Sequence, residues 1–418
     1  MIKSHVLNKI PTSPSVLPRT PKFRPFVGHF SDAMEVPQSF TVRDTINHLL
    51  GVSKEREPFF VVNLSNLVSQ FDRWTRNLPG VQPHYAIKSN PDRRIIQTLN
   101  SLGSKFDCAS QKEIQEVLSI TKDPSKIIFA NPYKIPHQLE YAASVGVERV
   151  TADNVTELEK LRFFHRNAKI LIRLKPDDSK SICRFSTKFG ATLPEALEML
   201  AYAKRFGLEI VGTCFHVGSS CQSAQTYADI LRDSAEVFRE GTALGLHMHL
   251  LDIGGGFPGL SEHSGDSFET MSETILSSVR AQFANVSDLQ IIGEPGRFFS
   301  AGAGTLVTSV IGKKACDIDG VPGYKYYIDE GVYGAFNCLI FDHAHPKLEL
   351  LKPRSDHVTP SIVFGPTCDS IDKIGEFQLP ELFIGDKLYV DNFGAYTSTS
   401  SSSFNGFKNS RRFYVYNE

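Results

Sequence analysis

The sequence places a lysine, a histidine, acidic side chains and a run of glycines directly after short apolar segments that read as β-strands. In a barrel of alternating strands and helices, the carboxyl ends of the strands meet at one rim, which carries the catalytic residues. Groups of these types, gathered in one place, could form an imine and bind a phosphate. The residues that close an apolar run are Lys88, Asp107, Asn131, Arg173, His216, Gly254 to Gly256, Glu294 and Arg297.

Lys88 follows the apolar residues Tyr85 to Ile87 at the end of a predicted strand. A lysine in such a place is costly to bury unless it is paired or functional. Desolvation favours its neutral amine, which is the form that an imine-forming lysine needs. A lysine whose long side chain simply reaches solvent is the commoner explanation when Lys88 is taken by itself.

Three further features of the predicted rim admit both a functional and a structural interpretation. The run Gly254 to Gly256 lets backbone N–H groups approach a phosphate, although a plain tight turn is the commoner explanation. Glu294 could keep a pyridine nitrogen protonated while Arg297 meets a phosphate, or the two could form an ordinary surface pair. His216 could act as an acid or stack on an aromatic ring, whereas a lone histidine is more often simply hydrogen-bonded.

Two more clusters of reactive side chains lie towards the C-terminus. In FDHAHPK, His343 and His345 are two residues apart and would share one face of a strand, as a pair of metal ligands does. No third ligand follows at a recognisable spacing, so the sequence predicts no metal site. In GPTCDSID, Cys368 lies beside Asp369, whose charge disfavours the thiolate and does not prepare a free nucleophile.

The elements that position these residues alternate between strand-like and helical patterns. Strand-like runs begin at Phe59 and recur at 83–88, 105–110, 126–131, 147–152, 168–174, 209–217, 249–255 and 289–295. Amphipathic helical segments lie between them at 64–78, 93–102, 111–120, 135–144, 154–167, 194–206 and 226–244. This alternation predicts a parallel sheet, and the strand count fits a TIM-type (β/α)₈ barrel better than an open doubly wound sheet.

The pattern changes near Ala301, after which β-rich runs are separated by Gly, Pro and Asp turns. This pattern of short strands separated by turn residues predicts an antiparallel β domain. We therefore expect three parts: an N-terminal arm with strands for the β domain at 1–58, a barrel at 59–300, and the β domain at 301–418. The proline-containing residues 1–26 are expected to form a loosely ordered arm.

Charge and cysteine content exclude several classes of protein. Lys and Arg total 45 against 46 Asp and Glu, so the chain lacks the basic surplus of a nucleic-acid binder. Seven unclustered cysteines without a CxxC pair predict reduced thiols and a cytoplasmic location. The N-terminus lacks the apolar core of a secretory signal, and no window approaches the ~18 apolar residues of a membrane span.

The features are more specific in combination than singly. A lysine early in a barrel, a glycine-rich turn, a Glu–Arg strand end and a β domain suggest pyridoxal phosphate chemistry. Over residues 59–407 the sequence resembles the eukaryotic-type ornithine decarboxylases, of the alanine-racemase-like fold group (fold type III). The motifs are YAIKSN (85–90), FDCAS (106–110), FANPYK (129–134), RLKPDDSKSICRFSTKFG (173–190), CFHVGSSC (214–221), DIGGGFPG (252–259), EPGRFF (294–299), DEGVYGAFNCLIFDHAHPK (329–347), GPTCDSID (365–372) and NFGAYTSTSSSSFNGF (392–407).

The resemblance implies roles for the rim residues, with pyridoxal 5'-phosphate as the cofactor. Lys88 matches the lysine that holds the cofactor as a Schiff base, and His216 matches the histidine that stacks on its ring. Glu294 matches the carboxylate that pairs with the pyridine nitrogen and makes the ring an electron sink. Asp107 and Arg173 fall on family positions near the cofactor. The phosphate-binding set corresponds to Ser219, Gly254, Gly255, Gly256, Arg297 and Tyr396.

The resemblance also implies a substrate with a distal ammonium, ornithine, which Asp342 and Asp369 would meet. In the family, Cys368 and Asp369 come from the partner subunit of a homodimer, and the cysteine gives the proton that replaces CO₂. Lys188 and Asp372 match a pair that bridges the dimer interface. The implied reaction converts L-ornithine to putrescine, the first step of polyamine synthesis.

Two alternatives are kept beside this interpretation. A related decarboxylase of lysine or arginine would use the same acids, and one extra methylene is worth only ~1–3 kcal/mol of discrimination. Diaminopimelate would instead call for an arginine to meet its distal carboxylate. The second alternative is a catalytically inactive protein like the antizyme inhibitors, which works by binding a protein partner. Retention of Lys88, Glu294 and Cys368 argues against it.

The sequence departs from the family pattern in two places. Phe341 precedes Asp342 where a tyrosine is usual in the animal enzymes, a change that adjusts the pocket and keeps the acid. The chain ends at Glu418, soon after the FNGF block, so we expect that the tail-driven turnover of the vertebrate enzymes does not apply. The resemblance leaves open whether an antizyme-like regulator binds.

Overall fold

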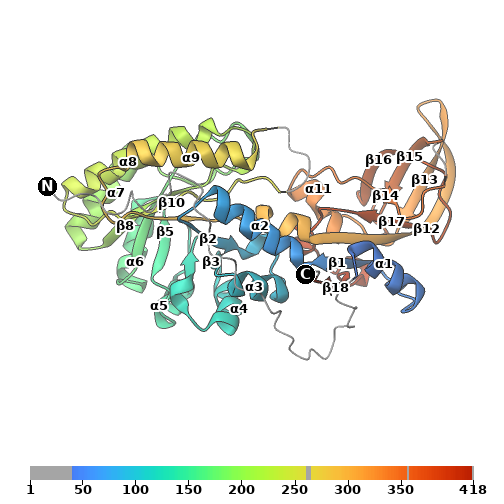
Figure 1. Cartoon of the computed structure of the whole chain (residues 1–418), viewed down its shortest axis with the longest axis horizontal. Helices are drawn as coiled ribbons and strands as arrows, with labels where there is room; N and C mark the ends of the chain where they lie inside the picture. Colours follow the sequence, from blue (N-terminus) through green and yellow to red (C-terminus); the bar gives the residue numbers. More distant parts are fainter. Residues whose placement is uncertain (1–39, 260–264, 355–356, 417–418) are drawn as a thin grey trace. The chain divides into compact units, whose positions relative to one another are not determined.

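The computed structural model describes residues 40–259, 265–354 and 357–416, and the predicted arm at 1–26 lies outside this part of the chain. The chain divides into two compact units (Figure 1). Among the described residues, the first unit comprises 68–258 and 265–298. The second comprises 40–67, 259, 299–354 and 357–416. Each unit therefore combines segments that are distant in the sequence.

A closed barrel of parallel strands forms the centre of the first unit, which confirms the predicted fold class. Its strands follow one another in the ring as β10, β11, β2, β3, β4, β5, β6 and β8. Their bounds are β2 Val81–Ala86, β3 Lys105–Cys108, β4 Ile127–Phe129, β5 Arg149–Ala152, β6 Lys169–Leu174, β8 Glu209–Phe215, β10 Leu250–Asp252 and β11 Gln290–Gly293. Because all eight strands run in one direction, their carboxyl ends share one rim.

Helices join the strands and lie outside the barrel, where consecutive helices from α3 to α9 pack against one another (Figure 1). They are α2 Leu64–Asn77, α3 Arg93–Ser101, α4 Gln111–Thr121, α5 Pro136–Ser144, α6 Val155–Phe164, α7 Leu193–Phe206, α8 Gln225–Ala243, α9 Phe268–Gln282 and the short α10 Arg297–Ser300. Side-chain caps begin several of them; Ser110, for example, accepts a hydrogen bond from Glu113 N–H at the start of α4. The helical segments read from sequence are confirmed, and α9 is an element that the sequence reading missed.

The inside of the barrel is filled with side chains. Buried residues from β4, β6, β8, β10 and β11 and their ends pack together there: Ile128, Ala130, Leu171, Val211, Cys214, Leu250 and Ile292. Burying one such aliphatic side chain contributes roughly 1.5–3 kcal/mol. The apolar runs in the sequence thus form a solid core, and polar residues are left for the rim.

A mixed sheet dominates the second unit. Its path runs β14, β17, β12, β13, β15, β16, and β1 pairs with both β12 and β18. The bounds are β1 Phe59–Asn63, β12 Gly304–Ile318, β13 Val321–Ile328, β14 Glu349–Leu350, β15 Thr359–Phe364, β16 Lys373–Leu379, β17 Lys387–Val390 and β18 Arg411–Val415. Most pairs are antiparallel, as predicted, but β1–β18 and β13–β15 are parallel.

One expectation about the N-terminal part is wrong. The run at Phe59 is not a barrel strand, because β1 lies between β12 and β18 in the mixed sheet. A strand buried on both faces has the same apolar pattern in either sheet, so its sequence could not separate the two. The strands expected somewhere in 1–58 are not tested, because residues 1–39 lie outside the described residues; of the part that is described, residues 42–51 form a helix, α1 (Val42–Gly51). A capping box between Thr41 and Asp44 fixes its start.

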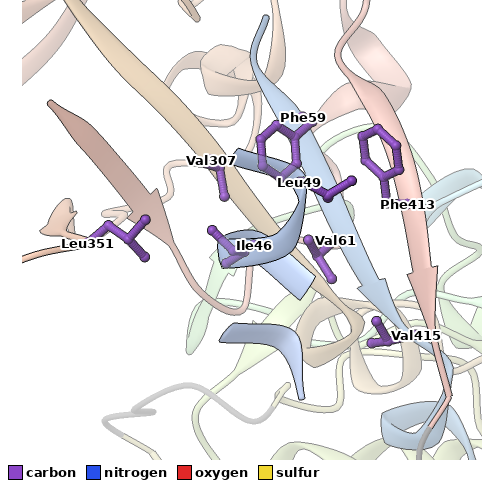
Figure 2. Packing of buried hydrophobic residues seen from close by; sticks show 8 residues of the cluster. All are labelled: Ile46, Leu49, Phe59, Val61, Val307, Leu351, Phe413 and Val415. Carbon is purple, nitrogen blue, oxygen red and sulfur yellow. The ribbon is translucent and has the colours of Figure 1, made fainter. Parts of the chain in front are cut away.

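Figure 2 shows how α1 is held on this sheet. Ile46 and Leu49 from the helix pack on Phe59 and Val61 of β1, and Phe413 of β18 meets Phe59 edge-to-face at 5.6 Å between ring centroids. Val307, Leu351 and Val415 complete the cluster. Segments from both ends of the chain therefore share one hydrophobic core. None of the helices that the structure describes is long and apolar enough to cross a membrane.

Candidate active site

The barrel rim gathers the polar residues that the sequence placed at strand ends. Asp107 and Arg173 lie within β3 and β6, and the remaining residues follow β2, β4, β8, β10 and β11. Lys88 lies in a short 3₁₀ turn, Ile87–Ser89, directly after β2. All of them belong to the first unit, so one closed sheet fixes their order around the rim.

Lys88 and Asp107 form the central ion pair of the rim. The Lys88 ammonium contacts the Asp107 carboxylate, and β2 and β3 are adjacent strands paired at Ala86 and Asp107. The Asp107 side chain is fully buried, while the lysine side chain is 37% exposed. The second oxygen of Asp107, Oδ1, is buried without a hydrogen-bond partner among the described residues. The pair therefore presents an accessible amine above a buried negative charge.

Two buried carboxyl groups lie side by side at the ends of β10 and β11. Burial raises the pKa of Glu294 well above its ordinary value, and the charges of Asp252 and Asp107 raise it further. Burial also raises the pKa of Asp252 to about 7, although this carboxylate accepts a hydrogen bond from Gly254 N–H at 2.8 Å. Oε1 of Glu294 has no donor among the described residues apart from the neighbouring Asp252 carboxyl, which can share a proton with Glu294. Such an acid would gain from a cationic donor placed beside it.

The glycine run after β10 packs tightly on the segment that follows β8. Gly254 has a φ of +62°, and a Cβ there would lie 1.8 Å from the carbonyl oxygen of Phe215. A Cβ on Gly255 would lie 2.8 Å from Nε2 of His216. Tyr227 donates a hydrogen bond from its hydroxyl to the carbonyl of Gly255 at 3.0 Å. Close packing by itself requires these glycines, so their phosphate-binding role stays a prediction.

His216 is half-buried, and its surroundings favour the neutral imidazole. Burial lowers the pKa of its imidazole well below the ordinary value, and the charges of Arg173 and Lys88 lower it further. Its Nδ1 accepts a hydrogen bond from Gly218 N–H at 3.1 Å. Phe185 contacts the ring edge-to-face, with 4.9 Å between centroids. A neutral, oriented imidazole suits stacking better than acid catalysis.

Ser219 and Arg297 meet although they are far apart in the sequence. Nη2 of Arg297 donates to Oγ of Ser219 at 3.2 Å. Ser219 begins the short strand β9 (Ser219–Cys221), which pairs with β7 (Ser181–Cys183). The structure thus brings together two members of the predicted phosphate-binding set. Hydroxyl and guanidinium donors at one place are suited to an anion.

Two residues near this site were missed by the sequence reading. Phe185, in the loop before α7, contacts His216. Glu113, at the start of α4, is half-buried; desolvation raises its pKa, and its carboxylate accepts from Ala109 N–H at 2.5 Å. The capping pattern Ser110-x-x-Glu113 marks a helix start, which explains the position of Glu113 without signalling a site.

The remaining predicted residues lie in the second unit, except Lys188, which is exposed on the first. Cys368 is exposed, and Asp369 is half-buried with its Oδ2 accepting from the Tyr333 hydroxyl at 2.6 Å. Asp342 and Tyr396 are also half-buried. The predicted roles of all these residues stay predictions. Among the described residues, no group of three or more His, Cys, Asp or Glu side chains is arranged to hold a metal ion.

Asp372 is almost fully buried within its own unit. It accepts hydrogen bonds from Val332 N–H at 2.8 Å and from the N–H and hydroxyl of Thr367 at 3.0 and 2.7 Å. A carboxylate has about four acceptor positions, so three bonds leave room for another donor. The first role of Asp372 is therefore to hold the 365–372 loop, and its predicted pairing with Lys188 across a dimer stays a prediction.

The chemistry of the barrel rim fits pyridoxal 5'-phosphate. Lys88 offers a primary amine, and Oε1 of Glu294 offers an acceptor for a protonated ring nitrogen. The Ser219–Arg297 pair offers donors for a phosphate, and the flat face of His216 offers a surface for a ring. These groups are the ones that this cofactor requires.

Comparison with known proteins decides the family. The family model described as "Pyridoxal-dependent decarboxylase, pyridoxal binding domain" matches residues 64–301. Ornithine decarboxylase of Mus pahari is 40% identical over 400 residues, which cover 92% of this chain and 87% of the relative. The chain belongs to the ornithine decarboxylase family. It is a carboxy-lyase whose cofactor is pyridoxal phosphate.

Other members of this family and fold differ in what they do. Antizyme inhibitor 2 of Xenopus laevis is 42% identical over 394 residues, covering 91% of this chain and 86% of the relative. The arginine decarboxylase of Paramecium bursaria Chlorella virus superposes with a TM-score of 0.84 at 36% identity, covering 89% of this chain and all of that one. A lysine/ornithine decarboxylase of Vibrio vulnificus superposes with a TM-score of 0.80 at 30% identity, covering 90% and 99%. Family membership alone therefore leaves the substrate open.

Proposed function

We propose that the chain decarboxylates L-ornithine to putrescine and CO₂, the first step of polyamine synthesis. The observation that supports the chemistry is the Lys88–Asp107 pair beside the buried Glu294, all on one rim. The choice of ornithine is supported by the sequence identity to enzymes named ornithine decarboxylase over nine-tenths of the chain.

When bound, pyridoxal phosphate supplies a conjugated ring that takes up the electrons left behind by CO₂. The Lys88 amine attaches the cofactor and later releases the product. Glu294 holds the proton of the ring nitrogen in place, because a buried carboxylate pairs strongly with a cationic donor. His216 supports the face of the ring as a neutral group.

We further propose that the active enzyme is a homodimer in which Cys368 and Asp369 complete the site of the partner subunit. Cys368 would give its proton to the substrate Cα, and Asp369, with Asp342, would meet the distal ammonium. Exposure of the Cys368 side chain in a single chain is compatible with this, because a proton donor must be able to reach the substrate. A thiol in this role must stay reduced, which suits the proposed cytoplasmic location.

The arginine and lysine/ornithine decarboxylases of the same fold make lysine and arginine the second candidates. The test is release of CO₂ from ornithine, lysine and arginine in parallel, with pyridoxal phosphate added. We expect the highest kcat/KM with ornithine and a slower reaction with lysine. Arginine or lysine as the best substrate would overturn the proposal for ornithine while leaving the carboxy-lyase activity intact.

The similarity to antizyme inhibitor 2 gives a third candidate, a protein whose function is to bind a regulator. Retention of Lys88, Asp107 and Glu294 in one connected arrangement supports the enzyme. An antizyme-like partner is compatible with either activity. A visible absorbance band in the cofactor-loaded protein, lost on borohydride reduction together with activity, is expected for the enzyme; a loaded protein without band or turnover would favour the binding protein.

A further inference from the structure

The 365–372 loop, which carries Cys368 and Asp369, is fixed at both ends but projects into solvent in between. Its ends are held by the buried Asp372 carboxylate, which bonds Thr367 within the loop and Val332 outside it. Cys368 is exposed. The end bonds therefore define where the loop leaves the sheet, and they do not by themselves fix the direction of the two functional residues.

A second loop supplies a bond to the backbone at Cys368. The Cys368 N–H donates to the side-chain carbonyl Oδ1 of Asn405 at 3.0 Å. Asn405 lies in the short turn Phe404–Gly406, where its φ is +54°. Asparagine is one of the few residues other than glycine that adopts this conformation readily, so the residue suits both the turn and the bond.

The same turn supports the partner of Asp369. The Tyr333 hydroxyl donates to Oδ2 of Asp369 at 2.6 Å, and the Tyr333 ring stacks on Phe404 with 4.4 Å between centroids. The Ser402 N–H donates to the carbonyl of Tyr333 at 2.8 Å. The serine-rich segment 398–407 therefore contacts the Cys368 side of the loop directly and the Asp369 side through Tyr333.

We propose that Asn405 and Tyr333 are positioning residues that present the Cys368 thiol and the Asp369 carboxylate in fixed directions. Asn405 acts on the backbone of Cys368, and Tyr333 acts on the carboxylate of Asp369. This inference rests on the proposed function, in which Cys368 protonates the substrate Cα and Asp369 meets its distal ammonium. The two bonds are separate, so they predict separate defects.

Loss of the Asn405 bond should change where the proton is delivered. In normal turnover the proton goes to Cα, and the products are CO₂, putrescine and unchanged cofactor. If it goes instead to the cofactor carbon, hydrolysis with one water gives CO₂, 4-aminobutanal and pyridoxamine phosphate. A misdirected thiol should raise this abortive fraction, because protonation at the two carbons competes.

The first experiment compares Asn405→Gly with Asn405→Asp in the cofactor-loaded enzyme. Glycine keeps the turn conformation but removes the side-chain oxygen that accepts from the Cys368 N–H. Aspartate keeps the turn conformation and an accepting oxygen. Pyridoxamine phosphate formed per CO₂ released should rise about two- to tenfold for Asn405→Gly, the effect of losing one hydrogen bond, and stay near the native value for Asn405→Asp. The matched control is Asn392→Gly, which replaces another exposed asparagine with a positive φ of 53° in the same unit.

The second experiment removes only the hydroxyl of Tyr333. Tyr333→Phe keeps the stack on Phe404, so KM for ornithine should rise about tenfold with kcat nearly unchanged. The dissociation constant of putrescine, measured by equilibrium dialysis, should rise by a similar factor. Tyr327→Phe is the control, because Tyr327 also stacks on a phenylalanine, Phe364, at 5.7 Å in the same unit.

The outcomes separate the inference from the proposed function. If Cys368→Ala itself forms no pyridoxamine phosphate, the proton-donor role proposed for Cys368 is wrong, and this inference falls with it. If Cys368→Ala forms it and Asn405→Gly does not, the proposed function survives and the positioning role of Asn405 is overturned. Equal rises in KM for Tyr333→Phe and Tyr327→Phe would likewise overturn the role of Tyr333.

Discussion

The barrel rim and the 365–372 loop hold their candidate catalytic groups in opposite ways. At the rim, Asp107, Asp252 and Glu294 are buried, and burial shifts the pKa values of the last two strongly upward. On the loop, Cys368 is exposed and Asp369 is half-buried. The Cys368 N–H donates a hydrogen bond to Asn405, and the Tyr333 hydroxyl donates one to Asp369. At the rim, the fold buries the acids and so shifts their pKa values. On the loop, hydrogen bonds orient Cys368 and Asp369, but the side chains are not in a low-dielectric environment.

The two regions should therefore respond differently to amino-acid substitution. A buried group at a strand end is fixed by the packing of the whole barrel, so altering it changes the electrostatics and little of the geometry. A loop group depends on a few local bonds and becomes buried only when something covers it. The predicted shared site would provide such a cover for Cys368 and Asp369.

The largest effect is expected at Lys88. Lys88→Ala removes the amine that attaches the cofactor, and turnover should fall by at least about 10³-fold. The visible absorbance of the loaded enzyme should disappear while circular dichroism stays native. Lys169→Ala, which removes an exposed lysine paired with Glu148 in the same barrel, is the control. Near-native turnover by Lys88→Ala would show that the barrel rim is not the catalytic site.

A smaller effect on rate, but a clear effect on products, is expected at Cys368. Cys368→Ala should lower kcat by about 10–10²-fold and produce pyridoxamine phosphate, because the acid that protonates Cα is gone. Quantifying pyridoxamine phosphate by chromatography measures the effect. The control is Cys316→Ala, a half-buried thiol of the same unit. Clean decarboxylation at the native rate would show that the loop takes no part in proton transfer.

The smallest effect concerns the pH dependence of stability in the cofactor-free protein. The pKa of Asp252 is raised to about 7 in the folded state, so between about pH 4 and pH 7 the folded protein binds more protons than the unfolded chain. Stability should therefore fall as pH rises through this window, by about 2–4 kcal/mol at most. Asp252→Asn keeps an acceptor for Gly254 and should make the dependence weaker, as measured by urea unfolding, while the raised pKa of Glu294 leaves a remainder. An unchanged slope would contradict the burial argument.

The rim residues could be predicted from the sequence, because catalytic residues of such barrels lie where the strands end. Short apolar runs identified the strands, and the polar residue that ends each run lies at the shared rim. The same rule failed at Phe59, where a central strand of a mixed sheet has the same apolar pattern as a barrel strand. It also could not identify Asp252 and Glu294 as a buried acid pair, since burial depends on packing across β10 and β11.

The roles of the 365–372 loop residues could be predicted only through the family resemblance. Residue types in GPTCDSID suggest no reaction by themselves, and the bonds to Asn405 and Tyr333 span 37 and 36 residues. No local pattern predicts such pairings. The buried Asp372 illustrates the same limit. The family resemblance implied a dimer-interface role, which stays a prediction, and gave no sign of the hydrogen bonds by which Asp372 holds the loop.

One measurement tests most directly whether the two regions form a single catalytic site supplied by two chains. Lys88→Ala and Cys368→Ala chains, co-expressed in equal amounts, should form mixed dimers in which one site lacks both groups and the other is intact. Assembly at random then gives about a quarter of native activity, which is higher than either variant alone. Activity no higher than that of Cys368→Ala alone would contradict the shared site.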